Sequence, residues 1–251
     1  MDAAKKKIRG RKLAVIQLFL LIAAIVSIVF LANSLEENRV IGVIEVTGNQ
    51  ALSYDEVVSE GVRKMVDTSK GSDVIFNVSS FLKKNPFVSD AFVSFQGSDK
   101  LIIEIKEKKP SAIIIDASGM PGFVCTDGTL LPYAHLPEFI NLPVIRLDKT
   151  GYTTGELSKI GAIDILQCLA RPECEFIQQN ISEMICNTSS KTYEMISSGF
   201  GIRIFFGTAE DACRKLNKLS VFWQHEMPGI VPAKVNYVDV RWNNQVVVNF
   251  S

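Results

Sequence analysis

The sequence predicts an α+β protein with three parts: a single N-terminal transmembrane helix, a β-α-α-β-β module, and an antiparallel β-sheet domain with two flanking helices. Three observations predict this class. An uncharged apolar run follows a basic N-terminus, the next segment switches between strand and helix periodicity, and the remainder consists mainly of short β-branched runs between turn signals.

The N-terminus has the pattern of a membrane anchor. Residues 1–12 hold six basic side chains and one acid, and residues 13–35 follow without a charge. About 20 apolar residues are enough for a helix to cross a bilayer. A cleaved signal peptide is the alternative, since Ala32-Asn33-Ser34 resembles a cleavage site, but its apolar region would be shorter, about 7–15 residues. We expect residues 1–12 to be a cytoplasmic tail and the body from residue 36 to be extracytoplasmic.

The rest of the chain carries 21 basic and 26 acidic side chains, although the 251 residues together have no formal net charge. A mildly acidic body lacks the basic surface that nonspecific nucleic-acid binding requires, so we expect no nucleic-acid partner.

Residues 41–108 form the β-α-α-β-β module. A β-branched strand ends at the turn signal Gly48-Asn49, and Ser53 with Glu56 forms a capping box that predicts the start of a helix. A shorter helix follows, capped by Asn77 and stopped before Pro86. The first helix has apolar residues at helical spacing, and these are expected to be core: Tyr54, Val57, Val58, Gly61, Val62 and Met65. In the last strand Leu101, Ile103 and Ile105 share one face.

The run "KEKKP" (106–110) marks the boundary to the second domain, 109–251. Short β-branched runs predict most of its strands, and a proline-rich run around Pro137 is expected to be loop or edge structure. Helices are predicted at 155–170 and 209–227. The second has acids in its first turn, Glu210 and Asp211, and an inward stripe: Ala212, Leu216, Leu219 and Trp223.

The chain ends on "YVDVRWNNQVVVNFS", residues 237–251, in which two runs of β-forming residues flank Asn243-Asn244. Asparagine tolerates the left-handed backbone of a tight turn, so this segment predicts a β-hairpin that turns at these two residues. The last strand lies either inside its sheet or at the edge. An apolar, barely charged edge strand pairs readily with another chain.

Candidate catalytic groups are few. Cys125 and His135 are the nearest Cys–His pair, which leaves a membrane-anchored wall-processing enzyme of sortase-like type as the alternative function, but "FVCTDGTL" lacks a sortase motif. The other cysteines, Cys168, Cys174, Cys186 and Cys213, include no CxxC pair. Cys168 and Cys174 are close enough in sequence to pair, but the sequence does not decide this, and small core residues are the default interpretation. We expect no metal, cofactor or small-molecule substrate.

Several segments resemble the bacterial cell-division family FtsQ/DivIB. They are the basic N-terminus with its single apolar run, "VTGNQALS" (46–53), "FVSDAFVSFQ" (87–96), "LIIEIKEKKPSA" (101–112), "GMPGFVCTDGTLLP" (119–132) and "YVDVR" (237–241). The last is the most specific, although Val240 stands where the family usually has Leu. The resemblance implies that residues 41–108 are a POTRA domain (polypeptide-transport-associated) that serves localisation. It also implies a non-enzymatic divisome scaffold in the inner membrane at the septum, with FtsB-like and FtsL-like proteins and septal wall synthases as partners.

The resemblance places the partner contact in the last strands, and the residues suggest strand addition to the sheet edge. Trp242 and Phe250 are the expected anchors, because buried aromatic side chains dominate binding hot spots. If the strand is regular, Val246, Val248 and Phe250 face one side and Gln245, Val247 and Asn249 the other. The candidate partner-binding residues are Trp242, Asn244, Gln245, Val246, Val247, Val248, Asn249 and Phe250, with Tyr237, Asp239 and Arg241 supporting the hairpin. The alternative is that residues 245–250 are fully paired inside their own sheet.

Overall fold

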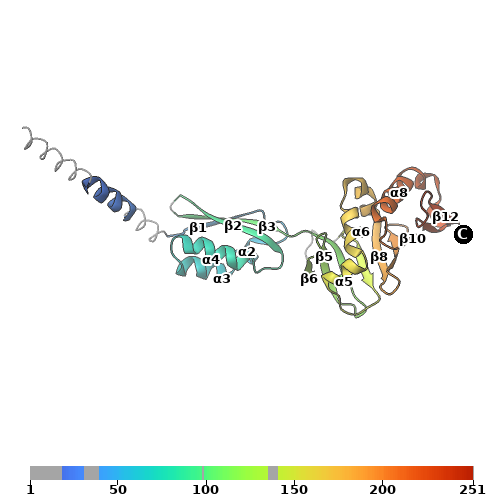
Figure 1. Ribbon diagram of the computed structural model, residues 1–251, viewed down its shortest axis with the longest axis horizontal. Helices are drawn as coiled ribbons and strands as arrows, with labels where there is room; N and C mark the ends of the chain where they lie inside the picture. The colour runs from blue at the N-terminus through green and yellow to red at the C-terminus, as the bar shows by residue number, and fades with distance from the viewer. Residues whose placement is uncertain (1–18, 31–39, 98, 135–140, 251) are drawn as a thin grey trace, which may run out of the picture. The chain divides into compact units, whose positions relative to one another are not determined.

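The structure is a computed structural model that describes residues 19–30, 40–97, 99–134 and 141–250. The chain divides into two compact units, Met1–Glu107 and Lys108–Ser251 (Figure 1). Over the described residues, the first unit contains a three-stranded sheet and the second a nine-stranded sheet. The protein therefore combines sheets with several helices, in agreement with the predicted α+β class.

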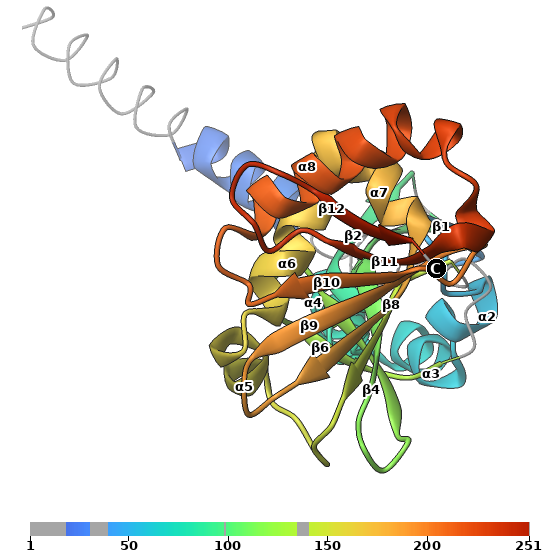
Figure 2. The same ribbon diagram turned by 90° about the vertical axis from the view of Figure 1, so that its right-hand side faces the viewer.

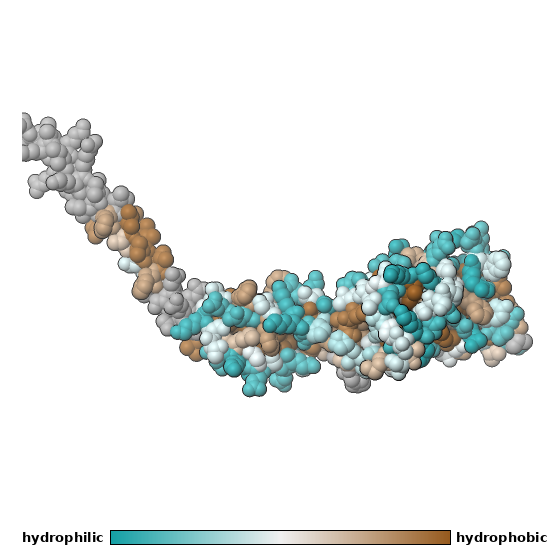
Figure 3. Space-filling model, turned by 60° about the horizontal axis from the view of Figure 1, so that its bottom comes forward, coloured by the Kyte–Doolittle hydropathy of each residue, from teal (hydrophilic) through white to brown (hydrophobic). Residues whose placement is uncertain are grey.

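Residues 19–30 are helical, and their apolar side chains are exposed, as the brown surface in Figure 3 shows. Within the described ranges, no helix has both the length and the apolar character needed to cross a membrane. The predicted tail (1–12) and the flanks of the predicted transmembrane helix, 13–18 and 31–35, lie outside the described residues. The membrane anchor therefore stays a prediction.

In the first unit, helices α2, α3 and α4 lie on one face of the sheet (Figure 1). Strand β3 is central: β1 pairs with it in parallel and β2 antiparallel. Leu101, Ile103 and Ile105 of β3 are buried on one face, which confirms their predicted alternation. The elements are β1 (Val43–Thr47), α2 (Tyr54–Val57), α3 (Glu60–Thr68), α4 (Ser72–Leu82), β2 (Val88–Gln96) and β3 (Lys100–Glu107).

The helices of this unit differ in detail from their predictions. The Ser53–Glu56 capping box is present, but the helix that it starts stops after one turn, and α3 begins a separate helix. Tyr54 is therefore not core: it is 43% exposed and its hydroxyl donates to Ile44 O. Asn77 caps nothing, because α4 starts at Ser72, and its amide instead donates to Ser69 Oγ from inside the helix.

The second unit contains a mixed sheet with the strand order β12-β11-β10-β9-β8-β7-β4-β5-β6 (Figure 2). The pairs β4–β7, β7–β8 and β10–β11 are parallel and the other pairs antiparallel, so the prediction of an antiparallel sheet is wrong for these three pairs. The strands are β4 (Pro110–Ile115), β5 (Pro121–Cys125), β6 (Leu130–Pro132), β7 (Val144–Leu147), β8 (Ile181–Asn187), β9 (Thr192–Ser197), β10 (Arg203–Gly207), β11 (Val235–Asp239) and β12 (Val247–Phe250).

Parallel pairing explains the additional helices, since parallel strands need a crossover connection. The segment between β7 and β8 folds into α5 (Thr154–Lys159), α6 (Ala162–Leu169), the 3₁₀ turn η2 (Pro172–Cys174) and α7 (Glu175–Asn180). Between β10 and β11 lie α8 (Ala212–His225), η3 (Met227–Gly229) and η4 (Pro232–Lys234). The unit thus has more α-helices than the two predicted.

The predicted helix at 155–170 is interrupted at Gly161. This glycine has φ 78°, and a side chain there would overlap Ala209, so α5 ends and α6 begins around it. Helix α8 buries the predicted stripe Ala212, Leu216, Leu219 and Trp223 against the sheet. Its predicted acidic first turn is wrong, because Glu210 and Asp211 precede its first residue.

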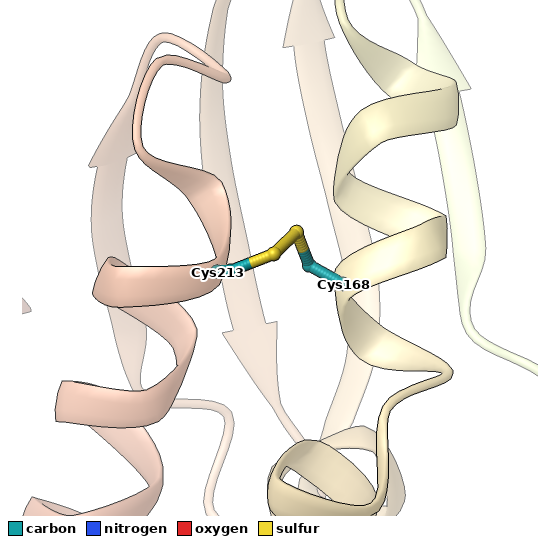
Figure 4. Close-up of a disulfide and its surroundings, with 2 residues drawn as sticks. All are labelled: Cys168 and Cys213. Atoms are coloured by element: carbon teal, nitrogen blue, oxygen red, sulfur yellow. A yellow bond between two sulfur atoms is a disulfide. The ribbon is translucent and has the colours of Figure 1, made fainter.

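A disulfide joins α6 to α8 through Cys168 and Cys213, whose Cα atoms are 4.9 Å apart (Figure 4). The pair is 45 residues apart in sequence, and the nearer candidate Cys174 is not its partner. Cys125, Cys174 and Cys186 are buried free thiols, in agreement with the default interpretation for these three.

Candidate partner-binding site

Strand β12 lies at one end of the nine-stranded sheet, next to β11 (Figure 2). The two strands are antiparallel, with Tyr237 opposite Asn249, Val238 opposite Val248 and Asp239 opposite Val247. Within the described chain, β11 is the one strand that pairs with β12, so the outer backbone edge of β12 is open. Open N–H and C=O groups along an edge are what a further strand can pair with.

The two faces of β12 are different. Val248, together with Val246 just before the strand, packs against the core. Val247 and Asn249 project to the opposite face, where the strand register aligns them with Asp239 and Tyr237. Val247 is half-buried, and Phe250 at the end of the strand is 55% exposed.

The predicted two-residue turn at Asn243-Asn244 is wrong, because β11 ends at Asp239 and β12 starts at Val247. The alternation of buried and exposed side chains along β11 breaks at this point, since Val238, Asp239 and Val240 are all buried. Asp239 accepts a hydrogen bond from the Arg241 amide, and the Val240 amide donates to Phe205 O of β10. The strand therefore turns out of the β11–β12 ladder, and residues 240–246 form a loop.

Helix α8 holds this loop. Lys218 Nζ donates to Val240 O and Gln245 O, each at 3.0 Å, and also to Trp242 O. Arg214, one turn earlier, donates to Asn243 Oδ1 at 3.1 Å. Burial lowers the pKa of Lys218, and the charges of Arg214 and Lys215 lower it further.

A cluster of aromatic and charged side chains supports the start of the loop. The Arg241 side chain donates to the Asp239 carboxylate and lies 5.4 Å from the centroid of the Phe205 ring. Phe205 meets Tyr237 edge to face, with ring centroids 5.0 Å apart. Burial alone would raise the pKa of Asp239, but hydrogen bonds from Arg241 and its charge lower it below the ordinary value.

Two large aromatic side chains mark the ends of the open edge. Trp242 in the loop is 57% exposed, and Phe250, which pairs with Val235 at the far end of the β11–β12 ladder, is 55% exposed. Asn244 and Gln245 are exposed on the loop between Trp242 and β12. Large apolar side chains beside a strand that is paired on one side only are typical of an interaction surface.

Residues 154–249, which include α8, the loop and most of β12, match the family model described as FtsQ/DivIB, C-terminal related. This match supports the resemblance of the chain to the FtsQ/DivIB family. No curated protein matches the chain. FtsQ/DivIB proteins are non-enzymatic scaffolds of cell division that act at the septum through protein interactions.

The structure brings together most of the residues that the sequence suggested for the partner-binding edge. Tyr237, Asp239 and Arg241 lie around Phe205, and Trp242 to Phe250 follow in the loop and β12. Sequence reasoning missed Phe205, Arg214 and Lys218. The spacing of Arg214 and Lys218 places both on one side of α8, but only the fold shows that this side meets the loop.

The Cys–His alternative to an FtsQ/DivIB scaffold finds no support at Cys125. Its side chain is buried in β5, and burial, with Asp127 nearby, raises the pKa of its thiol to about 11. A nucleophilic cysteine needs a lowered pKa so that the thiolate forms near neutral pH. His135 lies outside the described residues.

Proposed function

We propose that this chain is a non-enzymatic, single-pass scaffold of the bacterial divisome that binds FtsB-like and FtsL-like proteins through strand β12. Residues 13–35 anchor it in the inner membrane, the tail (1–12) is cytoplasmic, and residues 41–108 are a POTRA domain that helps to localise it to the septum. Septal wall synthases are further partners. The observation that carries the proposal is the open edge of β12 within the segment that matches the family.

Strand addition explains why this edge suits a protein partner. Main-chain hydrogen bonds along β12 provide affinity, and side chains that alternate across the strand provide specificity. Val247 and Asn249 are available on the face away from the helices, whereas Val246 and Val248 hold β12 against the core. Trp242 and Phe250 would flank the added strand at its two ends and become buried on binding.

Proline substitutions test this mechanism, because neighbouring residues in an antiparallel strand direct their amides to opposite sides. Of Val247→Pro and Val248→Pro, one removes a donor to β11 and the other removes a donor on the open edge. We expect the edge variant to keep the unfolding midpoint of the wild type. It should reduce capture of the co-expressed FtsB-like protein of the same genome by about tenfold, the effect of losing roughly one strong hydrogen bond.

Phe250→Glu tests the side-chain contribution in the same capture assay. Met120→Glu is the matched control, since Met120 is 66% exposed in the turn between β4 and β5, away from β12 in the strand order. The control should bind like the wild type. If the edge proline variant and Phe250→Glu both fold and retain full capture, β12 is not the binding edge.

The localisation role of residues 41–108 has its own test. A fluorescent fusion that lacks this segment should lose its concentration at midcell. Normal midcell localisation of the shortened chain would contradict the role assigned to the POTRA domain.

A further inference from the structure

We propose that Lys218 is the positioning residue of the partner-binding edge: its ammonium group fixes loop 240–246 and so determines where Trp242 and the start of β12 are presented. This inference rests on the proposed function of β12. Lys218 itself lies on α8, outside the hairpin, and is one of the residues that the sequence did not indicate.

The geometry at Lys218 satisfies the ammonium group completely. A lysine ammonium has three N–H donors and no acceptor. Here the three acceptors are the main-chain oxygens of Val240, Trp242 and Gln245. These three residues lie near both ends and in the middle of loop 240–246. One ammonium group therefore holds the loop closed through three hydrogen bonds.

Two further hydrogen bonds of the loop involve side chains. Asp239 accepts from the Arg241 amide at the beginning of the loop, and Arg214 donates to Asn243 at its tip. Carbonyl groups that converge on one point repel each other unless a donor lies between them. We therefore expect removal of the ammonium to open the loop rather than to leave it in place.

Helix α8 provides a fixed base for this contact. Leu216 and Leu219 on either side of Lys218 are fully buried, and Cys213 is held to α6 by the disulfide. Lys218 therefore extends from a helix that is fixed against the core, and its ammonium reaches the loop. This arrangement links the packing of α8 directly to the position of Trp242.

The arrangement is specific for a compact cation. An ammonium directs its donors toward three converging oxygens, whereas a guanidinium is planar and presents its donors as a fork. Lys218→Arg should therefore keep the charge but fail to restore the loop. An electrostatic role without positioning would instead be rescued by arginine.

Hydrogen exchange of the full-length protein, measured by mass spectrometry, tests the inference. In Lys218→Met we expect the amides of residues 240–250 to exchange at least about tenfold faster, as the loss of hydrogen bonds from a charged donor implies. Exchange in β9 and β10 should not change. Lys215→Met is the matched control, since Lys215 lies on the same helix and donates to Thr208 O.

A chemical rescue separates positioning from general destabilisation. Lys218→Cys treated with 2-bromoethylamine carries an ammonium at nearly the reach of lysine, and iodoacetamide gives a neutral adduct on the same residue. Cys125, Cys174 and Cys186 are buried and should be spared in the folded protein. We expect slow exchange at 240–250 to return with the ammonium adduct only.

The capture assay with the FtsB-like protein completes the experiment. Lys218→Met should reduce capture about tenfold, and the ammonium adduct should restore it. Unchanged exchange at 240–250 in Lys218→Met, or full rescue by Lys218→Arg, overturns the role of Lys218. A wild-type chain that captures no FtsB-like protein overturns the proposed function instead, and the exchange data then still decide whether Lys218 positions the loop.

Discussion

Arg241 closes over the carboxylate of Asp239, two residues before it in the chain. Arg241 Nη2 lies 2.6 Å from Asp239 Oδ2, and Nε lies 2.9 Å from Oδ1. Asp239 is only 4% exposed, whereas the side chain of Arg241 is 56% exposed. The exposed arginine therefore neutralises a buried charge at the point where β11 leaves its ladder with β12.

Replacing Arg241 with methionine should destabilise the second unit by about 1–3 kcal/mol, because it leaves a buried carboxylate without its main donor. Chemical denaturation of the full chain measures this loss. Arg203→Met is the control: Arg203 pairs with Glu194 at 3.0 Å, but the Glu194 side chain is 27% exposed whereas that of Asp239 is 6% exposed, so the loss of Arg203 should cost less than about 1 kcal/mol. Equal losses in the two variants would contradict the role of Asp239 burial.

Reducing the Cys168–Cys213 disulfide should lower the free energy of unfolding by about 2–4 kcal/mol, since the bond closes a long loop in the unfolded chain. The double variant Cys168→Ser/Cys213→Ser should behave like the reduced protein. Mass tagging of thiols after denaturation should give three labels without reductant and five with it. Five labels without reductant would show that the bond is absent.

Asp116 should make folding sensitive to acid. Its carboxylate accepts from the Ser118 side chain and from the Gly151 and Met120 amides, and these bonds hold its pKa at about 2 instead of 3.8. The Asp116 carboxyl therefore binds a proton more tightly in the unfolded chain than in the folded protein. The stabilisation of the fold by the ionised carboxylate is complete above about pH 4 and is lost as the pH falls toward 2.

Asp116→Asn removes this titration. The variant should be less stable than the wild type at pH 7, and the difference should shrink between pH 4 and pH 2, as followed by urea unfolding at each pH. A stability difference that stays constant across this range would contradict the assignment to Asp116.

Gly161→Ala should destabilise the second unit by more than about 1 kcal/mol, because residue 161 has a left-handed backbone and its new Cβ would overlap Ala209. Gly155→Ala is the opposite control. Gly155 lies in α5 with no atom near the added Cβ, so this variant should be stabilised by about 0.4–1 kcal/mol. Thermal unfolding of both variants distinguishes the two effects.

Local patterns predicted those elements whose buried face is marked by the periodicity of their own apolar residues. The alternation of Leu101, Ile103 and Ile105 identified β3, and the apolar stripe of α8 identified the helix and its buried side. The same local reasoning missed β7, a strand of four residues that is stabilised by parallel pairing with β4 and β8, far away in sequence. Nothing in "VIRL" and its neighbours indicates these partners.

The candidate site shows the same limit. The terminal strand and its supporting residues could be named from the sequence, but its turn could not, because the donors that shape the loop come from Lys218 and Arg214 on another element. The partner of Cys168 was likewise decided by the packing of α6 against α8 rather than by spacing along the chain.

The three buried free thiols have a consequence for the chemistry of the disulfide. Burial raises the pKa of Cys125, Cys174 and Cys186, so each is held as a thiol at neutral pH. Exchange with a disulfide requires attack by a thiolate. Once folded, the protein therefore has no ready nucleophile among these residues with which to reshuffle Cys168–Cys213, and a mispaired bond must be corrected before the core closes.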